Sequence, residues 1–188
     1  MFEFYTVREL YDLNNSKSEL EKNQIEYVEV DGWVKSNRDS GAVGFIVLND
    51  GSCFSNVQVV YNNTLSNHPE VSKILTGTSI KVCGKFCLTP NNKQPFEIQA
   101  TSVEILGNAD ETYVLQKKRH TFEYLREIPH LRPRTNTFLA VFRLRSILSM
   151  AIHEFFQKQG FVYVHTPIIT GNDAEGAGEV FTATNRDD

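Results

Sequence analysis

Two side chains in the first third of this sequence have the types and the spacing needed to bind an unpaired nucleobase. Gln58 stands between two valines, so a strand that turns the valines toward a core turns Gln58 outward. On the preceding run, Ile46 and Leu48 take the inward positions and leave Phe45 outward. An aromatic ring can stack on a base, a contact worth about 1–3 kcal/mol, while an amide pairs with the Watson–Crick edge of the base. A shift of one residue would instead bury Phe45, and periodicity alone leaves both alternatives open.

The acidic, glycine-rich segment 173–178 is a second place where chemistry is possible. Its glycines and other small residues permit unusual backbone angles. The carboxylate of Glu175 can therefore swing over a bound ammonium group. Taken by itself, such a segment is more often an ordinary surface loop.

Charge is distributed unevenly along the chain. The net charge is −4, and residues 1–108 carry 9 basic and 13 acidic side chains. The stretch from Lys117 to Arg145, in contrast, holds 8 basic side chains against only Glu123 and Glu127. This local excess of positive charge can meet phosphate groups although the whole chain is acidic. A solvated linker is the alternative, and the charge pattern alone favours it.

The cysteines and the apolar runs exclude several other classes of protein. Cys53, Cys83 and Cys87 are an odd number and make no disulfide framework. Cys83 and Cys87 stand about 13 Å apart in an extended strand, too far to share one zinc ion unless Gly84 breaks the strand. We therefore expect buried thiols and no metal site. No apolar run reaches the roughly 18 residues of a membrane span, so a cytoplasmic protein is the simplest expectation.

The spacing of β-rich runs between turn residues predicts a small barrel. A short helix at 68–75, opened by a proline, separates the third run from the fourth. Five strands with a helix at this place are the order of the OB-fold, an all-β Greek-key barrel that often binds oligonucleotides. We place the barrel at 25–107, after an N-terminal extension at 1–24. The expected strands lie near 25–36, 43–48, 54–61, 78–88 and 95–105.

The remainder of the chain predicts α+β structure. A linker at 108–134 contains a short helix at 121–127, for which Thr121 is a plausible cap. Apolar residues then recur every three or four positions over 138–159, which is typical of an amphipathic helix. We expect that helix to stop at Gly160 and to be followed by a strand that ends at Pro167. These elements belong to a second domain, which we place at 135–188.

The order of helix, Gly160, strand, Pro167 and glycine-rich loop resembles motif 1 and the following substrate flap of the class II aminoacyl-tRNA synthetases. The resemblance implies that the helix and the strand build a homodimer interface, with Pro167 at its two-fold axis. It also implies that Glu175 lies near the α-amino group of the amino acid substrate. The segment Glu-Gly-Ala-Gly-Glu-Val-Phe is most similar to the corresponding sequence of the asparaginyl-tRNA synthetases, which belong to the aspartate-like subgroup.

The β-rich region resembles the anticodon-binding OB domain that aspartyl-, asparaginyl- and lysyl-tRNA synthetases share. The resemblance implies that Phe45 stacks on the central uridine of the anticodon and that Gln58 hydrogen-bonds to that base. Arg38 matches an arginine that contacts the same loop. All three enzymes read a central uridine, so this domain does not define the amino acid. The resemblance is found in Gly32-Trp-Val34, Arg38, Phe45-Ile-Val-Leu-Asn-Asp50 and Val57-Gln-Val-Val60.

Class II enzymes also need motif 2 and motif 3, which supply arginines for the phosphates of ATP, and neither motif occurs in these 188 residues. We therefore assign no catalytic residue to this chain and expect it to be inactive alone. The resemblance implies an asparagine–tRNA ligase that uses ATP and Mg²⁺ when complete and binds asparagine and tRNA. An aspartyl-tRNA synthetase, possibly one that charges both tRNAs, is the enzymatic alternative. A stand-alone RNA-binding OB module with a dimerising helical tail is the non-enzymatic one.

Overall fold

The computed structural model describes residues 2–16, 26–116, 118–173, 176 and 181–184. The chain divides into two compact units, Met1–Ala140 and Val141–Asp188. The first unit contains the β-rich region and the linker, and the second contains most of the long helix and the residues after it. The domain boundaries expected from the sequence stay predictions.

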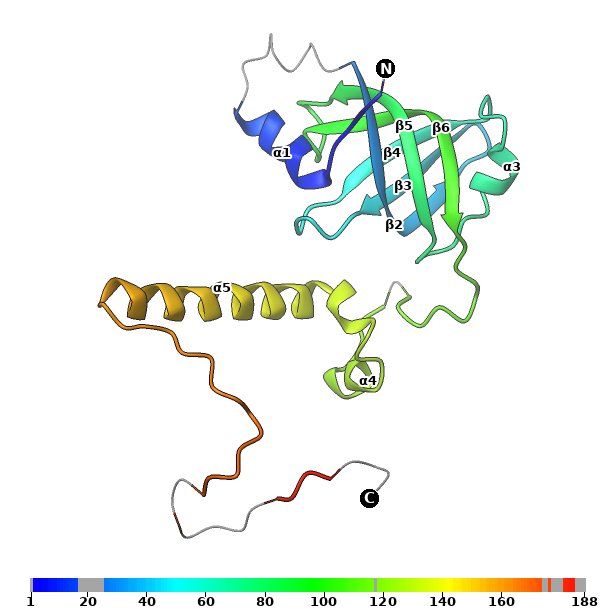
Figure 1. Cartoon of the computed structure of the whole chain (residues 1–188). Coiled ribbons are helices and arrows are strands. Elements are labelled where there is room, and N and C mark those ends of the chain that lie inside the picture. The colour runs from blue at the N-terminus through cyan, green and yellow to red at the C-terminus, as the bar shows by residue number, and fades with distance from the viewer. Residues whose placement is uncertain (1, 17–25, 117, 174–175, 177–180, 185–188) are drawn as a thin grey trace. The chain divides into compact units, whose positions relative to one another are not determined.

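Five strands of the first unit close into a barrel (Figure 1). Strand β2 pairs antiparallel with both β3 and β5, and β3 pairs antiparallel with β4. Strand β6 completes the ring through a parallel pairing with β4 and an antiparallel pairing with β5. This topology confirms the predicted OB-fold. The strands are β2 (Tyr27–Asp39), β3 (Val43–Asn49), β4 (Val57–Asn62), β5 (Ser79–Leu88) and β6 (Phe96–Gly107).

Alternation along the strands fills the barrel. Ile46 and Leu48 of β3 are fully buried, while Phe45 keeps 39% of its surface exposed. The two valines that flank Gln58 in β4 are at most 1% exposed. Each such aliphatic side chain contributes roughly 1.5–3 kcal/mol when it leaves water. The predicted face assignment is therefore confirmed, and the alternative with Phe45 in the core is wrong.

Short elements close the barrel at its ends. A two-residue strand, β1 (Glu3–Phe4), runs parallel to β2, and helix α1 (Val7–Ser16) follows it. Val7 and Leu10 of α1 are fully buried in the barrel core. Helix α3 (His68–Val71) lies between β4 and β5, as expected, but it is shorter than the predicted 68–75. These elements supply core residues that the strands alone do not provide.

The linker forms two short helical turns. Helix α4 (Phe122–Glu127) begins at Thr121, whose hydroxyl accepts a hydrogen bond from the Tyr124 N–H at 3.3 Å. The predicted cap is therefore confirmed. A 3₁₀ turn, η1 (Arg132–Arg134), comes directly before the long helix.

Helix α5 (Asn136–Lys158) confirms the predicted amphipathic helix. It stops at Gly160, whose φ of +85° is readily adopted only by glycine. None of its residues is buried. None of the described helices is long and apolar enough to cross a membrane.

The prediction of a strand between Gly160 and Pro167 is wrong, because the described residues form no strand there. The chain has neither a helix nor a strand assigned there. A strand is stabilised by hydrogen bonds to a neighbouring strand, and the described part of the second unit contains none. The side chains from Phe161 to Val164 accordingly stay 60–84% exposed.

Candidate nucleic-acid interface

The three residues that were expected to contact the anticodon loop lie on one outward face of the barrel. Arg38 of β2 stands directly opposite Phe45 of β3. Gln58 of β4 stands opposite Val47, one position along the face from Phe45. Such diagonal neighbours are about 7–8 Å apart, within reach of one planar base. We call this surface the outer face, and it consists of Ser36, Arg38, Phe45, Val47 and Gln58.

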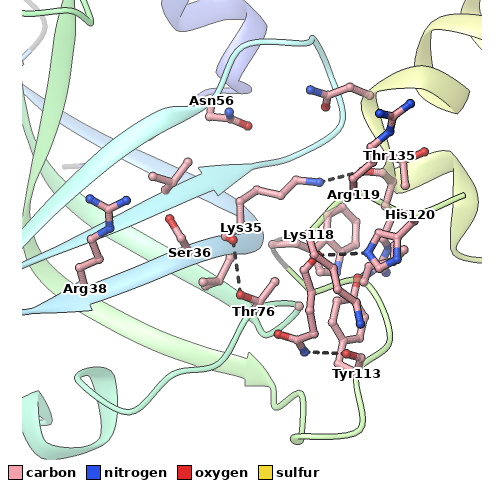
Figure 2. A pocket seen from close by; sticks show the side chains of 18 of the residues that line it. Lys35, Ser36, Arg38, Asn56, Thr76, Tyr113, Lys118, Arg119, His120 and Thr135 are labelled. Atoms are coloured by element: carbon pink, nitrogen blue, oxygen red, sulfur yellow. Dashed lines mark hydrogen bonds between the residues drawn. The ribbon is translucent and has the colours of Figure 1, made fainter.

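The outer face forms one side of a cleft of about 840 Å³ (Figure 2). The opposite side is a linker segment that we call the linker wall, residues 113–116 and 118–120. The basic character of this segment is evident in the sequence, but the sequence alone does not place the segment at a site. All lining residues belong to the first unit. The linker wall contributes Tyr113, Leu115, Gln116, Lys118, Arg119 and His120.

A bulge in β2 directs a lysine into the cleft. The register between β2 and β3 shifts between Val34 and Ser36, which leaves Lys35 as the extra residue. Lys35 Nζ donates a hydrogen bond to the backbone oxygen of Arg134 at 2.9 Å. Strand β2 is thereby tied directly to the turn that precedes α5.

Arg134 and Tyr113 hold the linker against the barrel. The Arg134 guanidinium carbon lies 4.6 Å from the centre of the Trp33 ring, and Arg134 Nη1 donates to the Tyr113 hydroxyl at 3.4 Å. The Tyr113 ring packs over Gly77, where a Cβ atom would lie 2.6 Å from a ring carbon. Gly77 also has a φ of +96°, so the position requires glycine for two independent reasons.

The cleft is cationic. None of the described residues that line it is acidic, whereas five are lysine or arginine. Burial lowers the pKa of the half-buried Lys35, and the neighbouring Arg134 charge lowers that pKa further. An anion in the cleft would offset both effects, because it stabilises the charged ammonium group. The five are Lys35, Arg38, Lys118, Arg119 and Arg134.

Gln58 has a partner that the sequence analysis missed. Its Nε2 donates to Glu97 Oε2 at 3.4 Å, across the parallel pair of β4 and β6. This contact orients the side-chain amide and leaves its carbonyl oxygen available as an acceptor. The two residues are 39 positions apart in the sequence, so local periodicity could not have identified the pair.

A polar cluster fixes the end of β2 next to Arg38. The Tyr61 hydroxyl lies 3.0 Å from Asn37 Oδ1 and 3.2 Å from Asp39 Oδ2, and its single proton serves one of them at a time. Burial, followed by the charge of Asp39, raises the pKa of Tyr61 to about 12. His68 Nε2 lies 3.1 Å from the same Asp39 oxygen. The backbone that presents Arg38 is therefore held from both sides.

Cys83 and Cys87 are half-buried rather than buried as predicted. Strand β5 continues through Gly84, although its register with β6 shifts there. Burial raises the pKa of both thiols. The described residues contain no group of three or more His, Cys, Asp or Glu placed to hold a metal ion.

Two family models match this chain. Residues 28–106 match the OB-fold nucleic acid binding domain, and residues 121–188 match the class II tRNA synthetases of the D, K and N group. The chain therefore combines an OB-fold nucleic acid binding domain with part of a class II tRNA synthetase domain. The first match covers the barrel, and the second begins at the cap of α4 and includes α5.

Curated proteins to which this chain is similar are asparagine–tRNA ligases. It is 59% identical to the one from Alkaliphilus oremlandii over 167 residues, which are 89% of this chain and 36% of the relative. It is 58% identical to the one from Bacillus cytotoxicus over 169 residues, or 90% of this chain and 36% of the relative. The chain thus spans little more than a third of the length of these relatives.

Solved structures show the same fold. One is the asparaginyl-tRNA synthetase from Pyrococcus horikoshii complexed with asparaginyl-adenylate, with a TM-score of 0.79 and 22% sequence identity. The match covers 100% of this chain and 42% of the Pyrococcus chain. Another is the Entamoeba histolytica asparaginyl-tRNA synthetase in complex with asparaginyl-adenylate, with a TM-score of 0.71 and 17% sequence identity. This match covers 91% of this chain and 39% of the Entamoeba chain.

The two remaining site residues of the class II resemblance are not part of the cleft. Pro167 is exposed and lies in the second unit, beyond the end of α5. Glu175 lies outside the described residues. Their roles in the dimer and at the substrate amino group stay predictions.

Proposed function

We propose that this chain is the tRNA-binding part of an asparagine–tRNA ligase, together with the beginning of its catalytic domain. The strongest support is the joint occurrence of Arg38, Phe45 and Gln58 on one open face of the OB barrel. The 59% identity to an asparagine–tRNA ligase favours asparagine over aspartate as the amino acid. In this proposal, 1–24 is an extension, 25–107 binds the anticodon, 108–134 is the linker and 135–188 begins the catalytic domain.

The outer face can recognise a central uridine by two complementary contacts. The exposed ring of Phe45 offers a surface on which the base stacks. The carbonyl oxygen of Gln58 accepts from uridine N3–H, while its second amide proton can reach O4. Cytosine presents an acceptor at N3 and a donor at N4, so the amide held by Glu97 would be mismatched. Arg38, across from Phe45, contributes charge to the same RNA loop.

The remaining roles belong to the longer protein. It would activate asparagine with ATP and Mg²⁺ and transfer it to the 3′ end of the tRNA. Glu175 would approach the α-amino group of asparagine. The exposed apolar residues of α5, with Pro167, would bury themselves in a homodimer. Sedimentation that shows a concentration-independent monomer of the longer protein would contradict the dimer.

The proposal is tested with labelled anticodon stem-loops that differ only in the central base. We expect the uridine stem-loop to bind more tightly than the cytosine one. Equal affinities would refute the assignment of the outer face.

A second assay tests the amino acid. A protein extended to the length of its relatives should catalyse asparagine-dependent exchange between ATP and pyrophosphate. Aspartate-dependent exchange would indicate the aspartyl enzyme instead. The 188-residue chain should show no exchange, since it lacks the arginines that stabilise the phosphate charge.

A further inference from the structure

The linker wall carries cationic side chains that the proposed recognition of the central base does not use. Lys118 and Arg119 are exposed and line the same cleft as Phe45 and Gln58. Figure 2 shows them, with His120, on the opposite side of the cleft from Arg38. A cleft with cations on both sides can hold a strand whose backbone is anionic.

The linker wall makes contacts within itself and with α4. Gln116 Nε2 donates to the Tyr113 backbone oxygen at 2.6 Å, and the His120 ring nitrogen lies 3.1 Å from the Gln116 backbone oxygen. The His120 ring stacks on Tyr124 of α4, with 5.4 Å between ring centres. These contacts distinguish the wall from a solvated linker, the alternative that charge pattern alone had favoured.

The charge balance of the cleft points to an anion as the missing partner. The described lining residues include five lysine or arginine side chains and no carboxylate, in a chain of net charge −4. Collecting like charges around one cleft is unfavourable unless a ligand neutralises them. The volume of about 840 Å³ falls within the range of ligand-binding clefts.

We propose that Lys118 and Arg119 form a phosphate-binding subsite for the RNA strand whose base lies on Phe45. This inference rests on the proposed function of the outer face. The subsite binds the sugar–phosphate backbone next to the central nucleotide, and Lys35 lines the same cleft. It adds affinity without reading sequence, because phosphates are the same in every RNA.

The test compares salt dependence with base preference. Dissociation constants for the uridine and cytosine stem-loops are measured from low to moderate salt for the unchanged chain and for a Lys118→Gln/Arg119→Gln double variant. Each phosphate contact to a single strand contributes about 0.7 to the slope of log affinity against log salt. We therefore expect the slope to become shallower by about 1.4 in the double variant, from two such contacts. The ratio of the two affinities should stay unchanged.

A matched control removes two charges elsewhere. Lys85 and Lys93 are exposed and are not among the cleft lining, so Lys85→Gln/Lys93→Gln should leave the slope nearly unchanged. Thermal unfolding checks that both variants are folded.

Three results would overturn the inference, and they can be told apart. If the unchanged chain prefers uridine but the cleft variant keeps the full slope, the phosphate subsite is wrong and the proposed function stands. If the unchanged chain shows no preference for uridine, the proposed function fails, and with it the strand placement on which the subsite depends. Equal slope losses in the cleft variant and the control would also refute the subsite.

Discussion

The two units of this chain differ in how far their apolar side chains are exposed to solvent. In the barrel, Ile46, Leu48 and the inward valines of β4 are at most 1% exposed. In α5, Leu144, Ile147 and Met150 are 57–67% exposed. A closed barrel satisfies its own backbone and core, whereas an isolated amphipathic helix gains stability only by packing against another surface. The barrel unit is therefore complete as a fold, and the helical unit needs a partner surface.

The largest test of this contrast truncates one aliphatic side chain in each unit. Ile46→Ala should lower the free energy of unfolding by about 2–5 kcal/mol, because it leaves a cavity in a fully buried site. Leu148→Ala in α5 should change it by less than about 0.5 kcal/mol in this chain, since Leu148 is half exposed. Urea denaturation measures both. Similar losses would mean that α5 is packed as firmly as the barrel.

A pH titration tests the polar cluster around Tyr61 at the end of β2. Tyr61 has its pKa raised to about 12 in the folded chain, whereas its ordinary value is 10.0. The unfolded chain therefore loses this proton first. The stability from neutral Tyr61 is fully present below pH 10 and declines as pH rises to 12 and beyond. The loss is on the order of 2 kcal/mol.

Tyr61→Phe provides the control for that titration. The variant should be less stable near neutral pH by about 1 kcal/mol, since the hydroxyl contacts with Asn37 and Asp39 are lost. The stability difference between the two proteins should then shrink above pH 10. A constant difference up to pH 12 would show that Tyr61 titrates at its ordinary value.

The outer face can be separated from the core that supports it. Phe45→Ala should weaken binding of the uridine stem-loop by about 1–3 kcal/mol through lost stacking. Unfolding should change little, because the Phe45 ring is exposed on the barrel surface. Gln58→Ala should reduce the preference for uridine over cytosine more than it reduces affinity for RNA in general. Equal losses on both stem-loops would remove Gln58 from base recognition.

The geometry of the linker wall can be disturbed without changing any charge. Gly77→Ala places a methyl group against the Tyr113 ring at a φ of +96°, which should cost about 1–2 kcal/mol of stability. Stem-loop affinity should fall because the wall moves, equally for both central bases. Gly41→Ala is a matched control, since Gly41 also has positive φ but no atom lies within 4 Å of the place that an added Cβ would take. Equal effects of both variants on binding would mean that backbone strain alone is responsible.

The sequence predicted the features that follow from the alternation of side chains along a strand. It did not predict the features that depend on contacts between distant residues. Alternation along β3 and β4 is sufficient to place Phe45 and Gln58 outward, because each faces away from fully buried neighbours in the same strand. The contact between Lys35 and Arg134 joins residues 99 positions apart, so no local pattern indicates it. The strand before Pro167 failed for a related reason. Its β-rich composition was recognised, but a strand also needs a neighbour, which composition does not supply.

The bulge at Lys35 has a consequence for how this chain tolerates a deletion. Val34 and Ser36 face consecutive residues of β3, so the ladder skips Lys35 when it pairs. A chain that lacked Lys35 would keep the partners of Val34 and Ser36, and Arg38 would still stand opposite Phe45. The pairing between β2 and β3 therefore does not require a residue at this position. At this extra position the Lys35 ammonium group reaches the backbone of Arg134, and the Lys35 backbone oxygen accepts a hydrogen bond from the Thr76 hydroxyl.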